Sequence, residues 1–173
     1  MKPLAFPTTV VFILAPMAMG AGIENDPTAE APSSSDLSPI YGVAIPSGYR
    51  HWEFVAPATE EAPLDELRAV LGNPAAIASS RADAPRFPDG TVFVKLAWKR
   101  KQSPDFDPAT VPGAATTVQV MVKDSKRFPS TGGWGFGRFI DGEPVDWAQH
   151  ETCWACHQAR ASDHDFVFTR YAP

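Results

Sequence analysis

The sequence predicts an α+β fold, mainly antiparallel β-sheet with a few helices, one of them around the C-terminal segment 153–157. Strand-like segments, in which apolar and polar residues alternate between Gly-, Pro- or Asp-containing turns, recur along most of the chain. Helical spacing of apolar residues is confined to short stretches. The chain has 173 residues, of which 44% are hydrophobic, enough to bury one core. We therefore expect a single folded domain after an N-terminal leader.

Residues 1–20 have the features of a cleaved signal peptide. Lys2 supplies the positive start, an apolar stretch follows as far as Met19, and Ala18 and Gly20 are the small residues that cleavage requires. The stretch is short and interrupted by prolines, so a retained membrane anchor is the weaker alternative. We expect the protein to be exported to the periplasm.

A linker and one domain are expected to follow the leader. Residues 21–39 are rich in Ala, Pro, Ser and acidic side chains and predict a flexible tether, while residues 40–173 hold the apolar segments of the folded domain. The formal net charge of −5 argues against a nucleic acid as partner. The basic run Lys99-Arg100-Lys101 is most simply a solvated strand end.

Five segments are predicted as strands: Tyr49–Ala56, Thr91–Lys99, Ala115–Lys123, Trp134–Ile140 and Asp165–Tyr171. The clearest of them is Thr91–Lys99, which follows the turn Pro88-Asp89-Gly90. Its alternation puts Phe93, Lys95 and Ala97 on one face and four apolar side chains on the other. We expect these strands to pair in an antiparallel sheet.

Three segments are predicted as helices. Leucines at positions 64, 67 and 71 have helical spacing and predict a helix over Asp65–Leu71 that ends at Gly72. Asn73 and Pro74 then offer a cap and a first-turn proline for a second helix that runs to about Arg81. The segment Asp146–Ala161 is expected to form the third helix.

The segment Cys153-Trp154-Ala155-Cys156-His157 is the most informative feature of the chain. Two thiols at this spacing can each add to a vinyl group of haem, and the histidine that follows can bind the iron. The alternatives are a thioredoxin-like redox pair, half of a zinc site, or chance, but neither a βαβ unit nor finger-like histidine spacing accompanies the motif. We therefore expect one haem c, covalently bound through Cys153 and Cys156, with His157 as an axial ligand of the haem iron.

The second axial position of the iron has no obvious protein ligand. Met121 is the one methionine outside the leader, and packing within the sheet is the favoured role for it. His51, His150 and His164 are weaker candidates for the same position. We expect five-coordinate iron with an open side, which binds a small molecule or supports chemistry, whereas purely electron-transferring haems usually fill both axial positions.

Six segments, in the order in which they occur, resemble the cytochrome P-460 family, which includes the β-sheet cytochromes c′ (the c′-beta group). They are Tyr49-Arg50-x-Trp52, Phe87-Pro88-Asp89-Gly90-Thr91-Val92-x-Val94-Lys95, Val122-Lys123-Asp124-Ser125, Gly133-Trp134-Gly135-Phe136, Cys153 to His157, and Phe166-Val167-Phe168-Thr169-Arg170. The resemblance implies a homodimer of mainly antiparallel sheet with one c-type haem per subunit. It also implies one of two activities. Cytochromes P-460 oxidise hydroxylamine and bond a lysine to the haem ring, whereas the c′-beta group binds nitric oxide beneath phenylalanines.

The resemblance also suggests roles for residues around the haem. Lys95 matches the cross-linked lysine, although its side chain could instead extend to the rim of a half-exposed sheet face. Arg68 matches an arginine near the haem pocket, and ordinary exposure on the predicted helix is the alternative. Phe87, and less clearly Phe54, are candidates for the distal aromatic cap, with sheet packing as the alternative.

One departure from the family pattern bears on the activity. Hydroxylamine-oxidising members carry a distal carboxylate just upstream of the haem motif, where it serves as a base. Ala148 and Gln149 stand nearest that place here, and Asp146 and Glu143 lie farther from it. The sequence therefore favours binding of nitric oxide or a similar small ligand. The alternative is hydroxylamine oxidation, with electron transfer to a soluble cytochrome.

Overall fold

The computed structural model describes residues 33–172, so the predicted signal peptide and most of the predicted linker lie outside the described residues. One six-stranded antiparallel sheet dominates the fold, and its strands pair in sequence order. They are β1 (Glu53–Glu60), β2 (Glu66–Gly72), β3 (Val92–Gln102), β4 (Thr110–Lys123), β5 (Trp134–Ile140) and β6 (Glu143–Pro144). The α-helices are α1 (Pro74–Arg81) and α2 (Trp147–Ala161), and short 3₁₀ turns lie at Ser34–Asp36, Tyr49–His51, Pro129–Thr131 and Ser162–His164. The predicted α+β class is confirmed.

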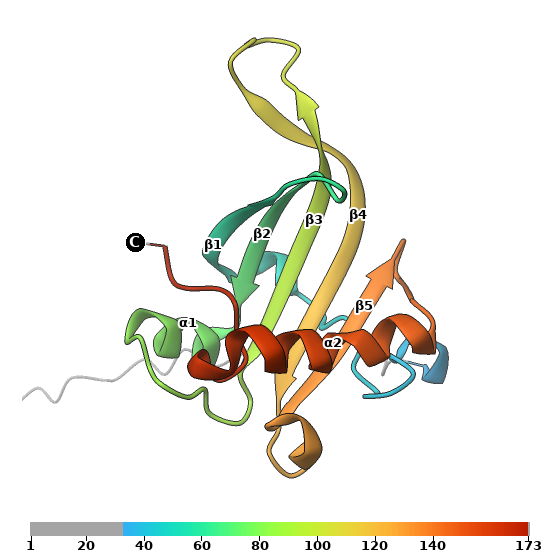
Figure 1. The fold of residues 1–173 in the computed structure, drawn as a ribbon, viewed down its shortest axis with the longest axis vertical. Coiled ribbons are helices and arrows are strands. Elements are labelled where there is room, and N and C mark those ends of the chain that lie inside the picture. The colour runs from blue at the N-terminus through green and yellow to red at the C-terminus, as the bar shows by residue number, and fades with distance from the viewer. Residues whose placement is uncertain (1–32, 173) are drawn as a thin grey trace, which may run out of the picture.

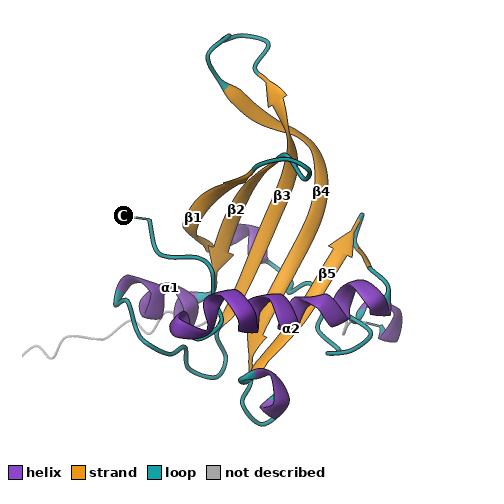
Figure 2. Ribbon diagram, viewed as in Figure 1, coloured by secondary structure: helices purple, strands orange, loops and turns teal. Residues whose placement is uncertain are grey.

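Helix α2 crosses one face of the sheet, and α1 lies beside it on the same side (Figure 1). Both helices cover the same end of the sheet, so the long β3–β4 hairpin projects beyond them (Figure 2). The projecting loop carries Phe106, whose side chain is exposed.

Apolar side chains pack on both faces of the sheet. On the side of α2, residues from the strands, α1, the loop before β3 and the C-terminal segment form one cluster, which consists of Val55, Val70, Ala76, Ile77, Phe87, Phe93, Trp134, Phe136 and Val167. On the opposite side, the N-terminal segment places Val43 against Val94, Val120, Phe128 and Phe139. The alternation predicted for the segment Thr91–Lys99 therefore supplies apolar residues to two separate layers.

The predicted helix Asp65–Leu71 is wrong, because this segment forms β2 and pairs with β1 on one side and β3 on the other. Leu67 and Leu71 fit both a helical face and one face of a strand, so their spacing is ambiguous over so short a segment. Pairing along both edges of the strand decides between the two, because tertiary contacts override weak local preference.

The predicted strand Asp165–Tyr171 is also wrong, since this segment follows α2 as irregular backbone. Asp165 and Phe166 have φ angles of 46° and 67°, in the left-handed region, so extended pairing is broken at its start. The first predicted strand begins late, because Tyr49–His51 forms a 3₁₀ turn and β1 starts at Glu53. The other strands and the two remaining helices were predicted at nearly their observed positions.

Candidate functional site

Helix α2 presents the cysteines and the histidine of the motif. Its first residues are fixed by Asp146, whose side-chain oxygen accepts a hydrogen bond from the Gln149 backbone N–H at 2.9 Å. Positions three and four apart share one face of a helix, so Cys153 lies beside Cys156 and His157 on α2. Both cysteines are free thiols, with Cys153 partly buried and Cys156 exposed. Burial raises the pKa of the Cys153 thiol, although the positive charges of Arg138 and Lys95 act in the opposite direction.

The His157 imidazole is held in one orientation by the C-terminal segment. Its Nδ1 lies 2.7 Å from the backbone carbonyl oxygen of Phe166. Because a carbonyl only accepts, Nδ1 carries the proton in this contact and Nε2 keeps its lone pair. The ring also packs against Phe136 and Phe168, with centroid separations of 4.9 and 4.7 Å. Burial lowers the pKa of His157, which favours the neutral imidazole that ligates metals.

The other candidate axial ligands lie in different surroundings. His150 is fully buried, and its Nε2 accepts from the Arg138 backbone N–H while its Nδ1 contacts the Asp146 carbonyl oxygen. His164 is buried with its ring against Phe87, and its Nδ1 contacts the Val167 carbonyl oxygen at 2.8 Å. His51 is exposed in a 3₁₀ turn before β1. Met121 pairs with Phe93 across β3 and β4 and packs against the apolar cluster.

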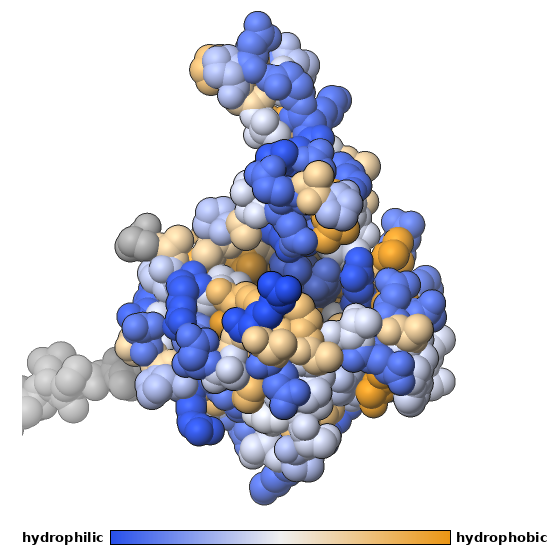
Figure 3. Space-filling view, viewed as in Figure 1, coloured by the Kyte–Doolittle hydropathy of each residue, from blue (hydrophilic) through white to orange (hydrophobic). Residues whose placement is uncertain are grey.

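A row of side chains crosses the sheet on the face toward α2. Cross-strand pairing places Val70, Lys95, Gln119 and Arg138 opposite one another on β2, β3, β4 and β5. Directly paired residues point to the same side of a sheet, so Lys95 and Arg138 share this face with Phe93. Hydrophilic residues line a hollow between α2 and the β3–β4 hairpin (Figure 3). The face that lies toward the motif is therefore apolar near α1 and polar farther along.

Lys95 lies on β3, where its side chain is partly buried. Burial lowers the pKa of its ammonium to about 8, and the positive charge of Arg68 acts in the same direction. Within the described part of the chain, its Nζ makes no hydrogen bond or ion pair. The Nε of Arg138 is likewise buried without a hydrogen-bond partner among residues 33–172. Lys95 and Arg138 thus share one face of the sheet and have hydrogen-bonding capacity that no residue among 33–172 uses.

Arg68 lies on β2 and not on a helix as predicted. Its guanidinium is paired with Glu60 and with the buried Glu66, whose Oε2 lies 2.8 Å from one guanidinium nitrogen. Glu66 also accepts a hydrogen bond of 2.7 Å from the Thr116 hydroxyl. Burial lowers the pKa of Arg68, and the nearby Arg138 adds to the effect. Arg68 is therefore neutralised by carboxylates, unlike Lys95 and Arg138.

The two phenylalanines predicted as a distal cap lie in different places. Phe87 is 3% exposed and packs against Phe93, Trp134 and His164 in the apolar cluster. Phe54 is exposed at a bulge of β1. Of the two, Phe87 lies on the side of the sheet that carries α2.

Upstream of the motif, the carboxylates are engaged or exposed. Ala148 and Gln149 form the exposed first turn of α2, and Asp146 is occupied as its N-terminal cap. Glu143 is exposed on β6. The other acidic side chains on the sheet face are Glu60 and Glu66, both paired with Arg68.

Sequence reasoning missed Arg138 and the buried pair of Lys123 with Asp165, which lies behind His157. A signal for Arg138 is its alternation with Trp134 and Phe136 in a strand otherwise made of glycines and aromatic residues. Asp165 follows the 3₁₀ turn that ends α2, and no local pattern links it to Lys123 on β4.

Two features bear on the alternatives for this site. Among residues 33–172, no group of three His, Cys, Asp or Glu side chains gathers as a metal-ion site would require. None of the helices in the same range combines the length and hydropathy of a membrane span. Two surface hollows, of about 340 and 380 Å³, are lined by residues other than the two cysteines and His157.

An antiparallel sheet, a C-terminal helix with two thiols followed by histidine, and a histidine with a free Nε2 together define a haem-binding cytochrome. The chain belongs to the cytochrome P460 family, whose model matches residues 46–169. A search of curated proteins found no match. The residues present fit a haem, since the two thiols share a face of α2 with His157 and the facing sheet offers two cationic side chains without partners.

Proposed function

We propose that this cytochrome is a periplasmic protein with one haem c, which is bound covalently through Cys153 and Cys156 and ligated by His157 alone. Its proposed role is the binding of nitric oxide or a similar small neutral ligand. The observation that carries the proposal is the hydrogen bond from His157 Nδ1 to the Phe166 carbonyl oxygen, because it leaves the lone pair of Nε2 available to a metal. A haem bound there supplies an iron centre that takes a small ligand and exchanges electrons.

The open axial position is supported by the surroundings of the other candidate ligands. Both ring nitrogens of His150 are engaged by backbone groups, and the His164 ring is packed against Phe87. Met121 is part of the apolar layer on the sheet. None of these three side chains is free to approach iron without leaving its packing, and His51 is exposed in the turn before β1, so we infer five-coordinate iron.

A titration with nitric oxide tests the proposal. The reduced wild-type protein, kept free of air, is expected to have the spectrum of five-coordinate ferrous haem and to bind one nitric oxide per chain. A six-coordinate spectrum that nitric oxide does not change would reject the open site. His157→Gly is the matched variant, because it should lose the axial ligand, and added imidazole should restore it.

A second candidate function is favoured by Lys95. Burial lowers the pKa of its ammonium to about 8, so a larger fraction is the neutral amine, the form that can bond to a haem ring. Hydroxylamine oxidation would then pass electrons to a soluble electron-transfer cytochrome and protons to a base. The acidic groups nearby weigh against it, since Glu60 and Glu66 are paired with Arg68 and Asp146 caps α2.

The two functions separate in one assay. Under the first proposal, hydroxylamine with an excess of an artificial one-electron acceptor gives no turnover above that of the His157→Gly variant. Turnover that Lys95→Ala abolishes would make hydroxylamine oxidation the function. Homodimer formation, which the family resemblance implies, is a further part of the proposal, and sedimentation of the holoprotein tests it.

A further inference from the structure

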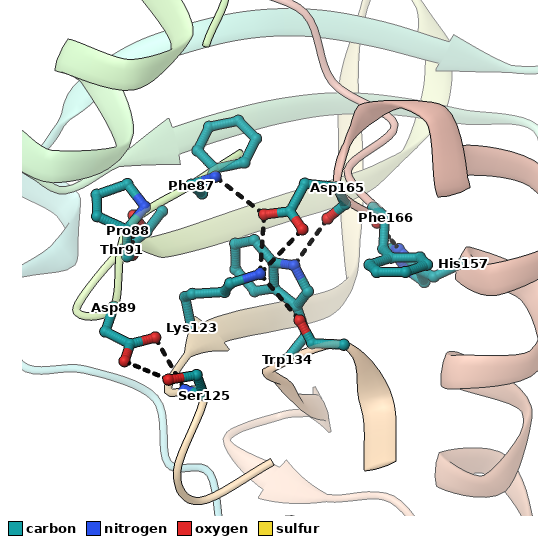
Figure 4. A network of polar contacts seen from close by, with 11 residues as sticks. Phe87, Pro88, Asp89, Thr91, Lys123, Ser125, Trp134, His157, Asp165 and Phe166 are labelled. Carbon is teal, nitrogen blue, oxygen red and sulfur yellow. Dashed lines mark hydrogen bonds and ion pairs between the residues drawn. The ribbon is translucent and has the colours of Figure 1, made fainter. Parts of the chain in front are cut away.

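A buried carboxylate joins three separate elements behind the motif histidine (Figure 4). Asp165, whose side chain is 2% exposed, lies 2.8 Å from Lys123 Nζ on β4. The same carboxylate accepts the Phe87 backbone N–H at 2.9 Å. Lys123 is fully used as well, since its Nζ also donates to the Gly132 carbonyl oxygen at 2.9 Å and lies over the Trp134 ring. Asp165 therefore ties the C-terminal segment to β4 and to the loop before β3.

The backbone at Asp165 is held in an unusual conformation. Asp165 and Phe166 have consecutive φ angles of 46° and 67°, which few residues other than glycine adopt. Such geometry persists where surrounding contacts fix it. Here the Trp134 indole N–H donates to the Asp165 carbonyl oxygen at 2.7 Å, and the Phe166 N–H donates to the Ala161 carbonyl oxygen at 2.8 Å.

The peptide group that follows this fixed point is the one that contacts His157. The Phe166 carbonyl oxygen lies 2.7 Å from Nδ1 of His157, and Gly132 leaves room for the Phe166 ring, because a Cβ there would lie 2.3 Å from the ring. A bond from Nδ1–H to an acceptor fixes the imidazole and strengthens the other ring nitrogen as a metal ligand. The position of one carbonyl oxygen thus governs the donor strength of Nε2.

We propose that Lys123 and Asp165, together with Trp134, are positioning residues that set the donor strength of His157 through the Phe166 carbonyl. This inference rests on the proposed function, in which His157 ligates the haem iron. A buried ion pair is weak evidence for stability by itself, because desolvation offsets the attraction between the charges. A role in fixing geometry accounts for its place, directly behind the acceptor of the histidine.

Substitution of the carboxylate tests the proposal on the haem-loaded protein. Asp165→Asn removes the charge but keeps an acceptor for the Phe87 N–H, and asparagine tolerates the left-handed backbone. Lys123→Met/Asp165→Asn also removes the ammonium that the single variant would leave unpaired. The expected result in both is a weaker iron–histidine bond, seen as a lower iron–histidine stretching frequency in the resonance Raman spectrum of the reduced protein. The reduction potential should rise, because a weaker donor stabilises ferric iron less.

Two further variants keep the test independent of folding. Trp134→Phe removes the hydrogen bond to the Asp165 carbonyl oxygen, one peptide group before the acceptor of His157, and should shift both quantities in the same direction by a smaller amount, even if Asp165→Asn does not fold. Asp89→Asn is the matched control, because it removes a surface charge near Lys123, while Asp89 bonds Ser125 and forms no hydrogen bond with the C-terminal segment as far as residue 172. Asp89→Asn should leave both quantities unchanged.

The failure of this inference differs visibly from failure of the proposed function. An iron–histidine frequency and a potential that stay at wild-type values in Trp134→Phe and in the folded Asp165 variants would overturn the positioning role. A wild-type protein without haem, or an axial ligand that survives His157→Gly, would overturn the proposed function and this inference with it.

Discussion

Lys95 is a partly buried ammonium that makes no ion pair or hydrogen bond among residues 33–172, and the negative charge of Glu66 offsets only part of the effect of burial. Its pKa falls from the ordinary 10.5 to about 8, since burial and the nearby Arg68 both disfavour the charged form. In the unfolded chain the side chain stays charged up to about pH 10.5. Folding therefore carries a penalty below pH 8, which is relieved as the pH rises from 8 toward 10.5.

This penalty predicts a pH-dependent gain for Lys95→Met. In a haem-free chain made by Cys153→Ser/Cys156→Ser, the substitution should raise the free energy of unfolding by about 1–2 kcal/mol at pH 7, a value reduced to allow for partial exposure. The gain should shrink between pH 8 and pH 10.5. Denaturant unfolding across this range measures it, with the exposed Lys99→Met as control. A loss of stability in Lys95→Met would mean that the ammonium has a favourable partner.

At the surface, the charge of Asp89 is predicted to stabilise the fold, whereas that of Lys95 destabilises it. Hydrogen bonds from the Ser125 hydroxyl and backbone N–H lower the pKa of this carboxyl. A depressed carboxyl pKa stabilises the fold above the unfolded value near 3.9, and this stability is lost as the pH falls through the folded value. Asp89→Asn should therefore lower the melting temperature at pH 7 and make little difference at pH 2. An equal loss at both values would show that the charge plays no part.

Asn73, which caps helix α1, also bonds the first residue of β3 and the turn before it. The Asn73 side chain accepts from the backbone N–H groups of Ala76 and Val92 and donates to the Gly90 carbonyl oxygen. Asn73→Ala should cost about 1–2 kcal/mol of stability, because it removes a cap and also a contact to β3. Asn73→Asp keeps the acceptor and loses the donor. Its free energy of unfolding in urea should therefore lie between those of the wild-type protein and Asn73→Ala. If Asn73→Asp unfolds as readily as Asn73→Ala, the donor contact dominates.

A helix or strand was predictable from the sequence where the spacing of its apolar residues, or a clear start signal, fitted only one of the two structures. The segment around Lys95 alternates over many residues after a clear turn, and Asn73-Pro74 signals a helix start, so β3 and α1 were predicted almost as observed. The segment around Leu67 fits two periods, and only pairing with β1 and β3 decides that it is a strand.

The candidate site was predictable to a similar degree. The motif predicts that Cys153, Cys156 and His157 lie together on a helix, because the three residues are close in sequence. The contacts that hold the segment after α2 were not predictable, because Asp165 contacts Lys123 and Phe87 across long sequence separations. Its left-handed backbone, and the break in the predicted last strand, follow from those contacts.

At the scale of the whole molecule, the proposed haem should be a major source of stability. It would occupy the face where Lys95 and the buried Arg138 Nε have no partners among the residues described. A group that binds only the folded state stabilises it. Cys153→Ser/Cys156→Ser should therefore lose the covalent haem and melt about 5–10 °C lower, as a loss of 2–3 kcal/mol gives for a chain of this size. Calorimetry measures this, and equal melting temperatures would contradict it.

The most direct test of the account is the optical spectrum of the reduced wild-type protein, purified after export to the periplasm. We predict an ordinary c-type, five-coordinate ferrous spectrum that Lys95→Met leaves unchanged, because the proposed function has His157 as the single protein ligand and no bond between Lys95 and the haem. A Soret band far to the red, restored to its ordinary place by Lys95→Met, would contradict this and make hydroxylamine oxidation the function.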